Sequence, residues 1–190
     1  MKLMQRFLTV FLVMGFISIC LTQQGKTETN DRDMSAIISK AEQGDADAQR
    51  NLGIMYVEGK GIPQDITQGV YWLSKAAEQG DAEVQIFLGI MYAKGIHVPQ
   101  DYKKSIDWLT KAAEQGLAGA QLKLGVLYEK GEGIQDYVKG YAWFNIAALQ
   151  EDKTAKKKKN LIVKKMSPGQ IKEGEKLSKE LYDKIHGQAE

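Results

Sequence analysis

Few residues of this chain are of the types that carry catalytic or metal chemistry. It has two histidines, His97 and His186, and they do not have the spacing of metal ligands. No Gly-x-Ser-x-Gly motif, phosphate-binding glycine loop or Cys/His pair is present. Paired carboxylates of the glycosidase type are not excluded, but no pair stands out. We therefore predict no catalytic residue, no metal site and no cofactor, and a protein that is not an enzyme.

The carboxylates are scattered as helix caps and surface charges, and Glu78 and Glu114 belong to a repeat of 36 residues. The middle copy, residues 84–119, contains Leu-Gly-Ile-Met-Tyr from Leu88, Pro-Gln-Asp from Pro99, and Trp108 followed by Lys-Ala-Ala-Glu-Gln-Gly. The first of these segments returns at residues 52–56 and, as Leu-Gly-Val-Leu-Tyr, at 124–128. Similarity at a fixed period of this length indicates a solenoid, because one unit cannot bury its apolar face alone.

Each unit is predicted to form two helices. In the first helix, Leu88, Met91 and Tyr92 lie on one apolar stripe. A glycine inside a helix costs about 1 kcal/mol relative to alanine, yet Gly53, Gly89 and Gly125 recur at one position. We interpret them as sites where the second helix packs closely.

The ends of the predicted helices are equally regular. Three aspartates stand at the expected N-cap of each second helix, and Asp45 and Asp81 can cap two first helices. Glycines follow the last turn of the second helices, where a left-handed residue is expected. These positions are Asp65, Asp101 and Asp136, and Gly44, Gly80 and Gly116.

These motifs resemble the Sel1-like repeat family, a relative of the tetratricopeptide repeats. The resemblance implies an all-α, right-handed α-α superhelix (a solenoid) of about nine helices. The predicted superhelix comprises a half-unit (35–47), three units (48–83, 84–119, 120–150) and C-terminal capping helices (151–190). We expect Trp72, Trp108 and Trp143 in equivalent buried sites. The other structural positions of the repeat are Leu52, Gly53, Tyr56, Leu88, Gly89, Tyr92, Leu124, Gly125 and Tyr128.

The C-terminal forty residues are predicted to close the solenoid. The segment Tyr141–Leu149 is apolar nearly all round, so another element must pack on it. Ser167 and Gln170 form a capping-box pattern that opens a final helix. The run of lysines at 156–159 is interpreted as a solvated helix face, and the absence of arginine after Arg50 argues against nucleic acid as a partner.

The first 24 residues have the pattern of a signal peptide. Lys2 and Arg6 precede an apolar run from Phe7 to Leu21 that is short for a membrane span. We expect an exported protein, periplasmic or secreted and bacterial, with a flexible leader over 25–34. A lipoprotein modified at Cys20 and an uncleaved anchor are the alternatives, and only this segment is expected to meet a membrane.

The function that we predict is therefore that of a binding scaffold for a protein or peptide partner. The resemblance implies that the partner is bound on the concave face, which the first helices line. The apolar residues among the candidate binding residues, which are named below, can equally belong to the core between repeats. An inhibitor or immunity-type protein that sequesters one exported toxin or enzyme is the first alternative. The second is a cell-wall hydrolase, either a β-lactamase or a peptidoglycan-related enzyme. The candidate binding residues are Arg50, Ile54, Glu58, Ile86, Ile90, Lys94, Leu122, Val126 and Lys130.

Overall fold

The computed structural model describes residues 33–131 and 134–187. The predicted signal segment and most of the predicted leader lie outside this part of the chain. All regular structure in the described residues is helical, and it begins with a helix over residues 33–42. The elements that follow are α2 (Ala46–Glu58), α3 (Ile66–Glu78), α4 (Ala82–Lys94), α5 (Tyr102–Glu114), α6 (Ala118–Lys130), α7 (Tyr137–Leu149), α8 (Lys153–Ile162), the 3-10 turn η1 (Val163–Lys165) and α9 (Pro168–His186).

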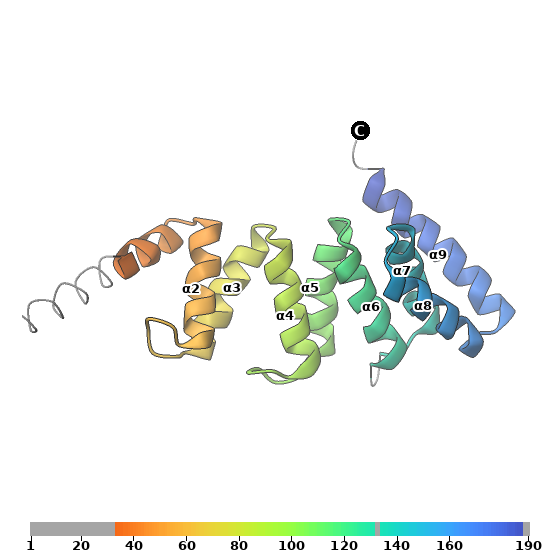
Figure 1. The fold of residues 1–190 in the computed structure, drawn as a ribbon, viewed down its shortest axis with the longest axis horizontal. Helices are drawn as coiled ribbons and strands as arrows, with labels where there is room; N and C mark the ends of the chain where they lie inside the picture. Colours follow the sequence, from red (N-terminus) through yellow and green to blue (C-terminus); the bar gives the residue numbers. More distant parts are fainter. Residues whose placement is uncertain (1–32, 132–133, 188–190) are drawn as a thin grey trace, which may run out of the picture.

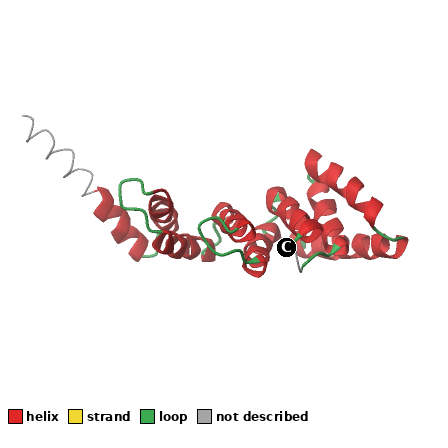
Figure 2. Ribbon diagram, turned by 90° about the horizontal axis from the view of Figure 1, so that it is seen from below, coloured by secondary structure: helices red, strands yellow, loops and turns green. Residues whose placement is uncertain are grey.

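The helices are arranged as a row of hairpins, which confirms the predicted α-solenoid. Each first helix packs on the second helix that follows it, giving the pairs α2/α3, α4/α5 and α6/α7. Figure 1 shows these pairs stacked along one axis, with α8 and α9 beside α7 at the C-terminal end. Only helices and loops are present in the described part, as Figure 2 shows from below.

The predicted helix caps are present. Asp65, Asp101 and Asp136 each accept a hydrogen bond at 3.0 Å from the backbone N–H three residues later. Asp45 and Asp81 cap α2 and α4 in the same way, and Leu117 at the start of α6 makes no such bond. Gly44, Gly80 and Gly116 have φ values of +94°, +99° and +86°, which are unfavourable for residues with a side chain.

The first-helix glycines mark close helix contacts, as predicted. A Cβ built on Gly53 would lie 2.9 Å from the backbone nitrogen of Leu73 and 3.0 Å from the carbonyl oxygen of Gly69. The equivalent atom on Gly89 would lie 2.6 Å from Cγ of Leu109. The absence of a side chain therefore lets each hairpin close.

The prediction for the tryptophans is partly wrong. Trp143 is 5% exposed, whereas Trp72 and Trp108 are only half-buried. All three pack against a core cluster between successive units. Trp143 is buried more deeply because its cluster also receives Leu181 and Ile185 of α9, and the earlier repeats have no such cover.

The C-terminal helices close the solenoid as expected. Ala155 and Ile162 of α8 are fully buried against α7. A Cβ on Gly174 of α9 would lie 2.7 Å from the ring of Tyr141, so α9 approaches α7 closely. Ser167 and Gln170 form the predicted capping box at the start of α9. These contacts cover the apolar helix α7, which no fourth repeat follows.

Candidate interaction surface

Two grooves lie between consecutive first helices. The α2/α4 groove has a volume of about 230 Å³ and the α4/α6 groove about 400 Å³. Eight of the nine candidate binding residues line them. Arg50, Ile54 and Glu58 line the α2/α4 groove, and Ile90, Lys94, Leu122, Val126 and Lys130 line the α4/α6 groove.

The ninth candidate, Ile86, lies outside both grooves. It is half-buried and packs on the core cluster that contains Leu124 and Trp143. Here the alternative interpretation of the sequence applies, in which an apolar first-helix residue belongs to the core between repeats.

Arg50 lines a groove but already has partners within the chain. Its guanidinium donates hydrogen bonds to Asp47 at 2.7 Å and to Asp81 at 2.9 Å. Asp81 is the N-cap of the next first helix, so the second contact links two consecutive units. Arg50 therefore has a structural role that its position in the sequence did not reveal.

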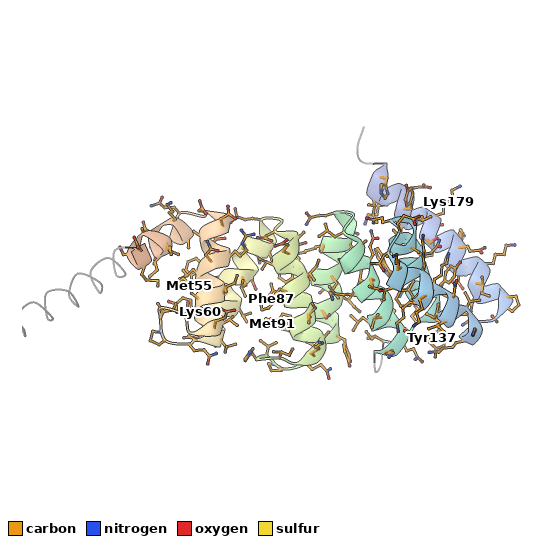
Figure 3. The ribbon with its side chains drawn as sticks, in the orientation of Figure 1. Met55, Lys60, Phe87, Met91, Tyr137 and Lys179 are labelled. Atoms are coloured by element: carbon orange, nitrogen blue, oxygen red, sulfur yellow. The ribbon has the colours of Figure 1, made fainter. Side chains whose placement is uncertain are left out.

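Phe87 was missed by the sequence reasoning. It lines the α2/α4 groove and is 41% exposed, beside Ile54, which is 39% exposed. Figure 3 labels Phe87 on α4. The other repeats have Asn51 and Lys123 at its position, so the comparison of copies hid it among polar residues. A large apolar side chain at an otherwise polar position was the signal available.

A repeated glutamine network joins the units, and it was also missed. Gln85 is 3% exposed and donates a hydrogen bond at 2.8 Å to the carbonyl oxygen of Ala77 in the preceding helix. Gln115 in turn donates to Oε1 of Gln85 at 3.0 Å and to the carbonyl oxygen of Gly80. The same arrangement joins Gln49 to Gln79 and Gln121 to Gln150. The recurrence of these glutamines with the repeat was the signal that the sequence offered.

A buried glutamate ties the last repeat to the C-terminal helices. Glu129 is 4% exposed and stands where the other repeats have Val57 and Ala93. Its carboxylate accepts hydrogen bonds from Lys158 at 2.9 Å and from Lys165 at 3.1 Å. Burial raises the pKa of Glu129, but the hydrogen bonds and charges of the two lysines outweigh it and hold the pKa below its ordinary value. Both lysines must therefore stay close for the buried charge to be stable.

The lysine run is consequently not a purely solvated face. Lys156 and Lys157 are exposed, but Lys158 and Lys159 are half-buried. Lys159 donates to Oδ1 of Asn145 on α7 at 3.2 Å. Half of the run thus packs onto the solenoid, because the partners of these lysines lie on α6 and α7.

The described residues give no indication of metal chemistry or of a membrane span. Within them, no cluster of three His, Cys, Asp or Glu side chains could hold a metal ion. No helix in this part of the chain has the length and apolar character that crossing a bilayer requires. His97 lies in a loop with φ of +62°, a left-handed conformation that histidine adopts more readily than most residues.

Comparison with known proteins decides the family. The family model of the Sel1 repeat matches residues 46–81, 82–117 and 118–152, which together are more than half of the chain. This chain belongs to the Sel1 repeat family. Each match begins at the first residue of a first helix and ends three residues after the following second helix.

Solved structures support the assignment of this Sel1-repeat chain. A Sel1 repeat protein from Oxalobacter formigenes is 38% identical, with a TM-score of 0.57, over 68% of this chain and 98% of that one. The protective antigen c5321 of uropathogenic Escherichia coli, which has an SLR fold, is 29% identical with a TM-score of 0.52. That match covers 80% of this chain but 41% of the antigen. No curated protein matches the chain.

Proposed function

We propose that this chain is an exported, non-enzymatic scaffold that binds a protein partner on the face formed by α2, α4 and α6. Sel1-repeat proteins generally act as protein–protein interaction scaffolds. Export is proposed from the basic and apolar N-terminal segment, Lys2 to Leu21, which has signal-peptide character.

One observation carries the proposal: the first-helix face contains two apolar grooves at equivalent positions of successive repeats. Five lining positions of the α2/α4 groove recur 36 residues later in the α4/α6 groove, among them Ile54 with Ile90 and Glu58 with Lys94. Grooves lined mainly by apolar side chains with a few charged groups are typical of binding sites. Because the two grooves lie on either side of α4, they form a surface that can bind a partner longer than one repeat.

The proposal is tested by comparing variants as baits in the exported fraction. The first pair of changes, Ile54→Ser with Phe87→Ser, alters the α2/α4 groove at exposed side chains. The second pair, Ile90→Thr with Val126→Thr, alters the α4/α6 groove while keeping branched side chains. A control carries Thr67→Ala and Lys103→Ala on the exposed faces of α3 and α5.

A partner cross-linked to the wild-type chain and to the control, but depleted from at least one groove variant, is the expected result. Each bait must first show the wild-type circular dichroism spectrum and melting midpoint, so that loss of binding is not loss of fold. Partners that bind all baits equally would contradict the proposed surface.

A further inference from the structure

The α4/α6 groove combines an apolar floor with a rim of one charge sign. Its floor is formed by Ile90, Leu122 and Val126, among other apolar residues. Its charged lining residues are Lys94, Lys123 and Lys130, and none of the described residues that line it is acidic. No acid in the described part of the chain forms an ion pair with these three lysines.

The preceding groove shows that the fold does not require lysine at the positions of Lys94 and Lys123. Glu58 occupies the position of Lys94 in the α2/α4 groove, and Phe87 occupies that of Lys123. The two grooves share helix geometry and differ in charge. The positive charge of the rim therefore comes from side chains that face the groove. These side chains can attract a negatively charged ligand.

The surroundings of the groove favour a helical ligand over an extended one. An extended peptide that binds by strand addition gains its main-chain hydrogen bonds from a strand edge, and the described residues contain no strand. The walls are mainly aliphatic, so they offer few partners for a peptide backbone. An amphipathic helix satisfies its own backbone hydrogen bonds and presents only side chains to the groove.

We infer that the α4/α6 groove binds an acidic amphipathic helix of the partner protein. The apolar stripe of that helix lies along Ile90, Leu122 and Val126, and its flanking carboxylates pair with Lys94, Lys123 and Lys130. This inference rests on the proposed function and narrows it to one class of partner.

The test is selection from a displayed library of amphipathic peptides of about 18 residues, long enough to form a helix. Their apolar stripe holds Leu or Ile, and their flanking positions hold Glu, Lys or Ser at random. Selection against the full chain should enrich Glu over Lys at the flanking positions. Binding of the selected peptides should weaken as the salt concentration rises.

Matched charge variants sharpen the test. The triple variant Lys94→Glu, Lys123→Glu, Lys130→Glu should bind the selected peptides roughly 10-fold more weakly, the combined effect expected of three partly exposed ion pairs. Selection against this variant should enrich Lys in place of Glu. A control triple, Lys103→Glu, Lys172→Glu, Lys179→Glu, changes the net charge equally at exposed lysines outside the groove and should bind like the wild type. Figure 3 labels Lys179 on α9, at the C-terminal end of the row of helices.

Several results would overturn the inference. These are enrichment of Lys or Ser by the wild-type chain, no enriched peptide at all, or equal weakening by both triple variants. Binding of single-stranded oligonucleotides that the groove triple abolishes, without peptide enrichment, would assign the lysines to nucleic acid instead. If the peptide test fails while the bait variants still lose a partner, the scaffold function stands and only the acidic-helix partner is wrong.

Discussion

At the scale of single residues, a missing side chain is as informative as one that is present. Gly89→Ala should lower the free energy of unfolding by ~1–3 kcal/mol despite better helix propensity, because the new methyl group would meet Leu109. Gly53→Ala should cost more, since its obstacles include backbone atoms of Leu73 and Gly69, which cannot rotate away. Urea unfolding of both variants measures the two changes.

Gly119→Ala is the matched control for these glycines. Gly119 lies in α6, and apart from its chain neighbours and its own helix backbone no atom lies within 4 Å of its built Cβ. The better helix propensity of alanine alone should therefore raise the free energy of unfolding by up to ~1 kcal/mol. A neutral or stabilising effect at Gly89 would show that the first helices are not held at the distance described here.

The buried glutamines give a second residue-scale prediction. Gln85→Met keeps a side chain of similar length but leaves the carbonyl oxygen of Ala77 and the amide of Gln115 without this partner. The unfolding free energy should fall by ~1–3 kcal/mol, the cost of unsatisfied buried polar groups. Gln68→Met, at an exposed position of α3, should change it by less than about 0.5 kcal/mol. Equal effects in urea unfolding would assign no stabilising role to the glutamine network.

The buried carboxylate of Glu129 predicts a pH dependence of stability. Its pKa is lower in the folded chain than in the unfolded one, so its contribution is fully present above the unfolded value of about 4.3. The contribution is lost as the pH falls through the folded value. The stability difference between the wild type and Glu129→Gln should therefore be largest at neutral pH and should shrink below about pH 4.3. Urea unfolding between pH 3 and 7 measures it, and a difference that grows on acidification would contradict this assignment.

At the scale of helices, the local rules of the sequence were sufficient for most of the fold. Asp101 and Gly80 act within a few residues of their own position, so their cap roles follow from sequence alone. The contacts of Glu129 could not be predicted in this way. Its lysine partners lie 29 and 36 residues further along the chain, on elements whose packing the repeat pattern does not specify. The pairing was hidden because the lysine run has the composition of a solvated face.

The C-terminal helices are predicted to be a structural cap. A chain that ends at Glu151 keeps Gln150 and its bond to Gln121, but loses the cover that α8 and α9 give to Trp143 and Phe144. The exposed apolar surface should make this chain aggregate or melt at a markedly lower temperature. Sedimentation and thermal melting test the expectation. A truncated chain that is monomeric and as stable as the full chain would indicate that these helices serve another purpose.

At the scale of the whole molecule, the repeat forms a groove at two equivalent places, and the two grooves differ in the charge of the side chains that line them. Sequence comparison of the copies identified Ile54, Ile90 and Val126 because they recur at one position. It could not identify Phe87, which occurs once, nor show that Ile86 turns into the core. Periodicity predicts which positions are equivalent, whereas exposure depends on how consecutive hairpins pack.

The most direct test of the proposed scaffold function is photo-cross-linking from defined positions on the full chain. A photoreactive phenylalanine analogue is placed at Phe87 or Lys94 on the first-helix face, and at Thr67 or Lys103 on the second helices. All four positions are exposed, so the fold should be retained. Analysis of the exported fraction by mass spectrometry should give one common partner from Phe87 and Lys94, and little of it from Thr67 and Lys103. Cross-links that form only from the second helices would contradict binding on the first-helix face.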